Sequence, residues 1–181
     1  NRAGTFGTFL RQGTTMKHSY IIAFWSPFPI TATDFCMDFF SSFFHRHGDI
    51  QCVLCNSDQK ERTIRILLHA DLMVVVFHQS YRELCRWITD DIYRFANCLY
   101  MIIDYFPEKD YSLIRISQDF RIPLSRLTCI PYNLKYREAS RRGAVRSYWR
   151  SCTRHGICQA GMDFYGELLR SARMMLKALG E

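Results

Sequence analysis

The sequence is poor in glycine and proline, with 9 Gly and 5 Pro among 181 residues. That composition excludes collagen-like repeats and Pro/Gly-rich low-complexity chains. Long hydrophobic runs are also missing, because no stretch approaches the roughly 18 apolar residues that a membrane-spanning helix needs. Apolar residues still make up 48% of the chain, which is enough for a buried core and argues against wholesale disorder. We therefore predict a soluble, cytoplasmic protein.

Cysteine, in contrast, is abundant, with eight residues in the chain. An even number can indicate a disulfide framework. Several of these cysteines, including Cys85, Cys98 and Cys129, lie inside apolar helix or strand patterns, where cysteine behaves as a small buried hydrophobe. We therefore predict reduced core cysteines, as is usual in the cytoplasm.

Short apolar runs alternate with helical patterns after a start that shows no periodicity. We expect residues 1–15 to be a disordered N-terminal extension and residues 16–181 to form a single domain. The strands predicted from the apolar runs span 20–26, 50–56, 71–78, 98–105 and 127–130. The first predicted helix follows the N-cap candidates Thr31, Thr33 and Asp34 and runs to about residue 45. The other predicted helices span 58–69, 81–95, 111–120, 135–151 and 163–179. This alternation predicts an α/β fold, a three-layer α-β-α arrangement with a mostly parallel sheet and C-terminal helices.

Several segments resemble one known protein family. The chain reads YIIAFWSPFP from residue 20, ADLMVVVFHQSYREL from residue 70, LYMIIDYFPEKDYSLIRISQDFRIPLSRLTCIPYN from residue 99 and EASRRGAVRSYW from residue 138. Together they resemble the ParA/MinD family of deviant-Walker P-loop ATPases, in particular a Firmicutes branch near the TadZ-type pilus-assembly proteins. The resemblance implies a P-loop NTPase-like domain. It also implies ATP and Mg²⁺ as cofactors, a homodimer, and a protein partner in a partition, positioning or pilus apparatus.

The sequence lacks the glycines and the lysine that a phosphate-binding loop needs. Glycines let backbone N–H groups approach the phosphates, and the lysine contacts them directly. After Ser26 the chain reads PFPITATD, which contains neither residue, so we expect impaired hydrolysis and assign no catalytic residue. By resemblance, Thr31 or Thr33 stands where the family binds Mg²⁺ through a hydroxyl. An ordinary helix N-cap is the interpretation that we prefer for both.

The distal half of the nucleotide site is better preserved. In the family, the adenine lies between the strand that is 98–105 here and the loop after the last strand. The resemblance therefore implies that Asp104, Pro131, Tyr132 and Asn133 bind nucleotide. A proline-marked strand end followed by an Asn turn explains the last three residues equally well.

Acidic residues are scarce near the C-terminus. Residues 135–154 contain seven basic side chains and one acidic side chain, which places +6 of the net charge of +7 in one stretch. Within a single helix, Arg142, Arg146, Arg150 and Arg154 would line one face. This pattern indicates binding to DNA or another polyanion, and the family binds DNA non-specifically through C-terminal helices. A solvated helix face and an acidic protein partner are the alternatives.

Two further patterns suggest weaker functional hypotheses. Cys52 and Cys55, together with Cys152, His155 and Cys158, have spacings found among zinc ligands. The first pair lies in a predicted strand, where a spacing of three points side chains to opposite faces, so we expect no metal site. The apolar stripe over residues 163–179 should pack on the sheet; a dimer contact or a membrane-surface helix is the alternative, and membrane binding ranks last.

The sequence thus supports two hypotheses of different classes. The first is a ParA/MinD/TadZ-like ATPase relative with impaired hydrolysis and a basic DNA-binding face. The second is a non-enzymatic interaction protein, a pseudo-ATPase that binds DNA or an acidic protein partner.

Overall fold

The computed structural model describes residues 19–55, 60–88, 97–108, 111–155 and 163–180. Its centre is a sheet whose strands match the five predicted from apolar runs to within one residue at every described end. The strands are β1 (Tyr20–Trp25), β2 (Ile50–Cys55), β3 (Leu72–His78), β4 (Cys98–Tyr105) and β5 (Leu127–Pro131). Every pair of neighbours is parallel, so the predicted parallel sheet is confirmed. The expected disordered extension, 1–15, lies outside the described residues.

The strand order is β2-β1-β3-β4-β5. This is the flavodoxin-like order of doubly wound sheets, in which the chain reverses its direction of winding between β1 and β3. On β1, Ala23 is opposite Val53 of β2 on one side and Met73 of β3 on the other. Ligands of such sheets bind at the carboxyl ends of the strands, which makes that edge the first place to look for a site.

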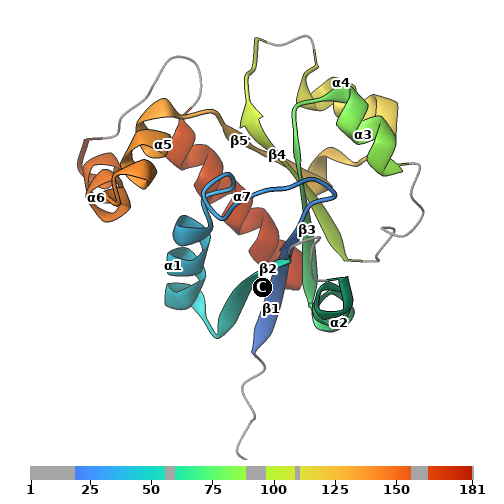
Figure 1. Cartoon of the computed structure of the whole chain (residues 1–181), viewed down its shortest axis with the longest axis horizontal. Coiled ribbons are helices and arrows are strands. Elements are labelled where there is room, and N and C mark those ends of the chain that lie inside the picture. The colour runs from blue at the N-terminus through green and yellow to red at the C-terminus, as the bar shows by residue number, and fades with distance from the viewer. Residues whose placement is uncertain (1–18, 56–59, 89–96, 109–110, 156–162, 181) are drawn as a thin grey trace, which may run out of the picture.

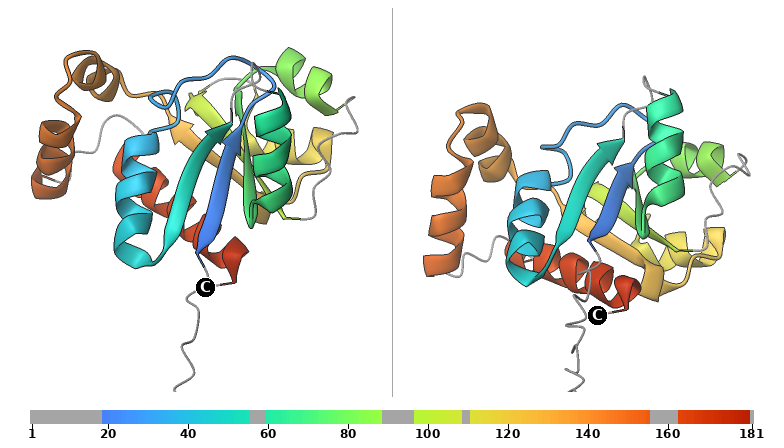
Figure 2. Two further views of the ribbon diagram at one scale, coloured as in Figure 1. Left: turned by 60° about the horizontal axis from the view of Figure 1, so that its bottom comes forward. Right: turned by 90° about the horizontal axis from the view of Figure 1, so that it is seen from below.

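Helices cover both faces of the sheet, as the three-layer prediction requires (Figure 1; Figure 2). Two of them, α1 (Met37–His47) and α7 (Phe164–Leu179), share one face. The opposite face carries α2 (Lys60–His69), α3 (Tyr81–Ile88) and α4 (Leu113–Phe120), and a short 3-10 turn, η2 (Leu124–Arg126), leads into β5. Between β5 and α7 the chain makes an excursion through α5 (Leu134–Arg141) and α6 (Val145–His155), which lies at the margin of the molecule in both views of Figure 2.

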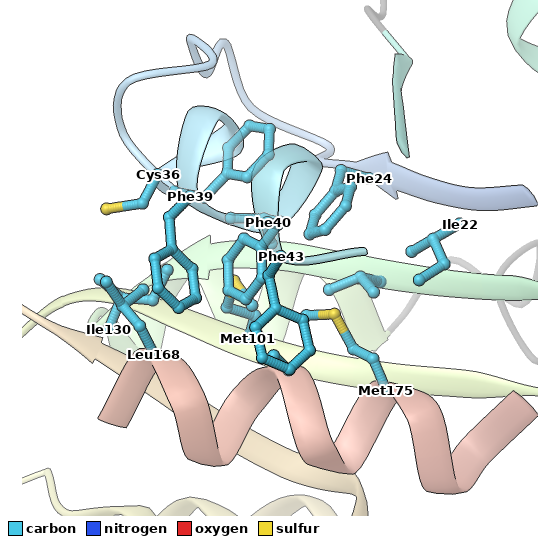
Figure 3. Packing of buried hydrophobic residues seen from close by; sticks show 14 of the residues in the cluster. Ile22, Phe24, Cys36, Phe39, Phe40, Phe43, Met101, Ile130, Leu168 and Met175 are labelled. Carbon is cyan, nitrogen blue, oxygen red and sulfur yellow. The ribbon is translucent and has the colours of Figure 1, made fainter. Parts of the chain in front are cut away.

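Alternating strand residues supply two separate cores. On β1, Ile22 and Phe24 point toward α1 and α7, whereas Ala23 and Trp25 face α2, α3 and α4. Figure 3 shows the first core, in which phenylalanines of α1 project toward Leu168 of α7. A fully buried phenylalanine contributes about 1.5–3 kcal/mol relative to exposure, so this aromatic layer fixes α1 and α7 on the sheet. The expected packing of 163–179 on the sheet is confirmed.

Two helix boundaries differ from the predictions for identifiable reasons. The first helix begins at Met37, beyond the predicted cap residues Thr31, Thr33 and Asp34, because Cys36 takes a left-handed conformation with φ 56°. The predicted helix 135–151 is two helices, because Gly143 has φ +67° and ends α5. The N–H of Gly143 donates to the carbonyl of Ser140, and that of Ala144 donates to Ala139, which is a Schellman-type helix end. The C-terminal part of the helix predicted over 81–95 lies outside the described residues.

The described cysteines are free thiols, and most of them are buried. Cys52 packs against the first core and Cys55 belongs to the second, so the prediction that this pair faces opposite sides of β2 is confirmed. Cys158 lies outside the described residues. In the described part of the chain, none of the helices has the length and apolar character needed to cross a bilayer.

Candidate functional site

A polar cluster lies at the carboxyl edge of the sheet, between the loop after β1, the end of β4 and helix α5. We define it by Thr33, Asp34, Asp104, Arg137 and Ser140. The Nη2 atom of Arg137 lies 2.6 Å from both carboxylate oxygens of Asp104 and 3.6 Å from Oδ1 of Asp34. The hydroxyls of Thr33 and Ser140 are 3.2 Å apart. The structure thus brings two predicted site residues, Thr33 and Asp104, into one cluster.

Asp104 reaches Arg137 through an irregularity in β4. The pairing of β4 with β5 shifts register between Ile102 and Tyr105, and Asp104 within this interval has a positive φ of 52°. Bulges of this kind redirect a side chain, and aspartate tolerates the left-handed region better than most residues. The side chains of Asp104 and Arg137 keep only 29% and 25% of their surface exposed. The irregularity therefore positions Asp104 for a half-buried ion pair with Arg137.

Tyr132 completes this edge with an aromatic surface. Its ring stacks on Phe106 at a centroid distance of 5.1 Å, and the guanidinium of Arg137 lies 5.5 Å from its centre. The backbone N–H of Tyr132 donates to the carbonyl of Tyr105 at 3.1 Å. Both residues of the stack keep somewhat more than a third of their surface exposed. Tyr132, which is predicted to contact nucleotide, thus lies at the same edge as Asp104. One face of its ring stacks on Phe106, and Arg137 is its cation–π partner.

Pro131 and Asn133 are accounted for by the turn that joins β5 to α5. Pro131 is the buried last residue of β5 and pairs with Tyr105. Asn133 is buried, and its side-chain oxygen accepts a hydrogen bond from the N–H of Tyr136 at 2.9 Å. That bond caps the first turn of α5. These contacts match the strand-end-and-turn interpretation of both residues.

The threonines before α1 do not cap that helix, so our N-cap interpretation is wrong. Thr31 is exposed and donates both its backbone N–H and its hydroxyl to Oδ2 of Asp34, at 2.7 and 2.9 Å. Cys36, with its left-handed backbone, is the residue that precedes α1. The hydroxyls of Thr31 and Thr33 are therefore engaged with Asp34 and Ser140 instead of with helix N–H groups.

The charge of the polar cluster disfavours a phosphate. One guanidinium, on Arg137, faces two carboxylates, on Asp34 and Asp104, which leaves one net negative charge. Burial lowers the pKa of Arg137, but the hydrogen bond and the charge of Asp104 outweigh it and raise that pKa, so the guanidinium stays protonated. Anionic phosphates would meet like charge here and would lack the backbone cradle that glycines provide.

A second candidate surface is the outer side of the α5–α6 excursion. We define the basic face as Lys135, Arg141, Arg142, Arg146 and Arg150, all of which are exposed. In the described part of the chain, Arg141, Arg142 and Arg146 have no carboxylate partner. Arg154 is also a predicted DNA-binding residue, but its side chain lies outside the part of the chain that the structure describes.

The underside of α6 is apolar and aromatic. The residues that face inward recur at helical spacing and are Val145, Tyr148, Trp149 and Cys152. The indole of Trp149 stacks on Phe164 at 6.1 Å with an interplanar angle of 4°. Its N–H donates to Oδ2 of Asp38, whose other oxygen accepts from the Tyr136 hydroxyl at 2.6 Å. The aromatic residues among the arginines therefore attach α6 to the body of the protein.

Sequence reasoning missed three members of the polar cluster, Asp34, Arg137 and Ser140. The sequence places Asp34 at a helix start and Arg137 in the basic stretch 135–154. The position of Arg137 was the available signal, because a residue in the first turn of a helix that follows a parallel strand lies at the carboxyl edge of the sheet.

For metals, no group of three or more His, Cys, Asp or Glu side chains in the described ranges is arranged to hold an ion. Comparisons of the chain with protein-family models, with curated proteins and with solved structures gave no match.

Proposed function

We propose that this chain is a non-enzymatic, DNA-binding relative of the ParA/MinD/TadZ ATPases, acting in the cytoplasm in a partition, positioning or pilus-assembly apparatus. The parallel α/β sheet is compatible with this origin. The observation that carries the proposed activity is the basic face, where the exposed Arg141, Arg142 and Arg146 lack carboxylate partners in the described part of the chain. ATP, Mg²⁺ and nucleotide-driven dimerisation belong to the family and are not part of this proposed activity.

The polar cluster supports the non-enzymatic form of the proposal. The residues that the family resemblance assigns to nucleotide bind one another: Thr33 contacts Ser140, and Asp104 is paired with Arg137. A nucleotide would have to break these contacts and then place its phosphates beside two carboxylates. The segment between β1 and α1 also offers no glycine or lysine to compensate.

Isothermal calorimetry with ATP, with and without Mg²⁺, tests this part. We expect binding weaker than millimolar in both cases. An ATP dissociation constant below millimolar that tightens with Mg²⁺ would instead support the ATPase hypothesis, and it would leave the DNA-binding part of the proposal standing.

The basic face supports DNA as the partner. Guanidinium groups on DNA displace condensed counterions, so each phosphate contact adds about 0.9 to the slope of log K against log salt concentration. Arg142 and Arg146 flank the turn between α5 and α6 and are both exposed. We expect the double variant Arg142→Ala/Arg146→Ala to make this slope shallower, reducing its magnitude by roughly 2, in a fluorescence-anisotropy titration with duplex DNA.

A matched control removes the same charge elsewhere. The variant Arg65→Ala/Arg82→Ala deletes two exposed arginines from α2 and α3, on the opposite face of the sheet. It should leave the salt slope within about 0.5 of the wild-type value. Equal slopes for the two double variants would show that net charge, and not the basic face, determines binding. Equal affinity for a polyglutamate chain of matched charge would assign the surface to an acidic protein partner.

A further inference from the structure

The α5–α6 excursion has the layout of a helix-turn-helix. Helix α5 has 8 residues and α6 has 11, and between them lie only Arg142, Gly143 and Ala144. Gly143 takes the left-handed conformation, with φ +67°, that a sharp turn requires. Short turns of three or four residues, often with glycine, join the two helices of DNA-binding helix-turn-helix units. The two helices run in clearly different directions (Figure 1; Figure 2).

The second helix is two-sided in the way that a recognition helix must be. Its inner side is held by the first core, through Trp149 on Phe164 and the hydrogen bond of Trp149 to Asp38. Its outer side presents Arg146, Ser147 and Arg150, all exposed. These residues lie one, two and five positions after the helix start, in the N-terminal half that meets base edges when a recognition helix enters the groove.

The arginines gather where the DNA backbone would pass. Arg141 is the last residue of α5, Arg142 lies in the turn, and Arg146 lies in the first turn of α6, so all three lie at or near the turn. In helix-turn-helix complexes the first helix crosses the phosphate backbone while the second lies in the groove. The major groove of B-DNA is about 12 Å wide, which admits an α-helix of 10–12 Å diameter. Both views of Figure 2 place α6 at the margin of the molecule, beyond α1.

From this geometry we propose that α6 is a recognition helix that enters the major groove of double-stranded DNA, with Arg146, Ser147 and Arg150 toward the bases and Arg141 and Arg142 on the phosphates. The inference deepens the proposed function and rests on it. It differs from simple polyanion binding because it requires a wide major groove. A-form RNA has a deep, narrow major groove that a helix cannot enter.

The test compares a labelled DNA duplex with an RNA duplex of the same sequence, by fluorescence anisotropy at one salt concentration. We expect at least tenfold weaker binding to RNA. We also expect displacement from DNA by methyl green, which occupies the major groove, and none by netropsin, which occupies the minor groove.

A pair of charge variants locates the contact. Ser147→Glu adds one negative charge to the outer side of α6, and Gln118→Glu adds the same charge to an exposed position of α4, across the sheet. Both are exposed helix positions, and circular dichroism checks that both variants fold. We expect Ser147→Glu to weaken DNA binding at least tenfold more than Gln118→Glu does.

The outcomes separate the two proposals. If the wild-type chain binds neither duplex at 50 mM salt, the proposed function fails, and this inference fails with it. If DNA and RNA duplexes bind equally, or if Ser147→Glu behaves like Gln118→Glu, the chain binds polyanions but α6 does not enter the groove. Either of those last results overturns the recognition-helix inference alone.

Discussion

At the scale of single residues, Asp38 joins three helices. It lies in the first turn of α1, and its two oxygens accept from the Tyr136 hydroxyl of α5 and the Trp149 indole of α6. Tyr136 is buried, with 3% of its surface exposed, and burial raises the pKa of its hydroxyl well above the ordinary value. The hydroxyl therefore stays a hydrogen-bond donor at any physiological pH. Without Asp38 this buried donor would lose its carboxylate acceptor.

We expect Asp38→Ala to lower the free energy of unfolding by about 1–3 kcal/mol, because it removes the carboxylate that accepts two hydrogen bonds. Urea denaturation followed by circular dichroism measures the change. Gln118→Ala, at an exposed site of α4, serves as the control and should stay within about 0.5 kcal/mol of the wild type. Equal midpoints for the two variants would mean that Asp38 does not hold the excursion.

Local rules predicted one residue-scale contact and failed at another, since Asn133 caps α5 as its turn suggests whereas Thr31 and Thr33 do not cap α1. Asn133 follows a proline-ended strand, and its capping bond to Tyr136 is the short-range contact that an asparagine at such a turn favours. The pairing of Asp104 with Arg137 depends on a register shift in β4 and on where α5 begins after β5. Neither is encoded in the neighbours of Asp104, so this ion pair could not be read from the sequence.

At the scale of elements, Gly143 separates α5 from α6. It occupies the position after the helix end in a Schellman-type motif, where the backbone is left-handed. A regular arginine spacing through this segment suggested one continuous helix. The conformational freedom of Gly143 was the stronger signal, because a left-handed residue ends a helix whatever its neighbours are. The strands were easier to predict than the helix ends, since each is a short apolar run in a sheet that is covered on both faces.

Gly143→Ala should lower the free energy of unfolding by about 1–2 kcal/mol, because a Cβ atom strains a left-handed residue. Apart from Gly143 and its two chain neighbours, no heavy atom lies within 4 Å of the position that the new methyl group would occupy, so the cost is conformational and not steric. Thermal and urea unfolding measure it.

Gly48→Ala is the matched control. Gly48 also follows a helix, but its φ of 166° is extended backbone that any residue adopts, and the added methyl group would lie 4.0 Å from Ile50. We expect it to be neutral or slightly stabilising, by up to about 1 kcal/mol. If both substitutions cost the same, the left-handed turn is not what separates α5 from α6.

At the scale of the whole molecule, the alternation of strands and helices predicted a parallel three-layer fold, but it could not specify the strand order. Whether β2 pairs with β1 at the edge of the sheet, as it does here, or with another strand depends on long-range packing. Here the aromatic face of α1 packs on α7 through Phe39, Phe40 and Phe43 (Figure 3). Helix α1 also packs on β2, while α7 packs on β5 and β3, so together the two helices cover one face of the sheet from β2 to β5.

Thiols are distributed through both cores, and this gives the fold a sensitivity to alkaline pH. Burial raises the pKa of Cys52, Cys98 and Cys129 from an ordinary 9.0 to about 12 each. A thiol that titrates higher in the folded state than in the unfolded chain stabilises the fold fully below pH 9. Its contribution is lost as the pH rises from 9 through 12, because the unfolded chain releases protons that the folded chain retains.

We therefore expect the free energy of unfolding, measured in urea with a reducing agent, to fall between pH 7.5 and pH 10 by about 1 kcal/mol for each of these thiols. Cys98→Ala and Cys129→Ala should each reduce this fall in the free energy of unfolding by about 1 kcal/mol. Val75→Ala, which shortens a buried side chain of the same core as Cys98, should lower stability equally at both pH values because it removes no titrating group. If the free energy of unfolding of the two cysteine variants falls as much between pH 7.5 and pH 10 as that of the wild type, proton release from the buried thiols is not the cause of the fall.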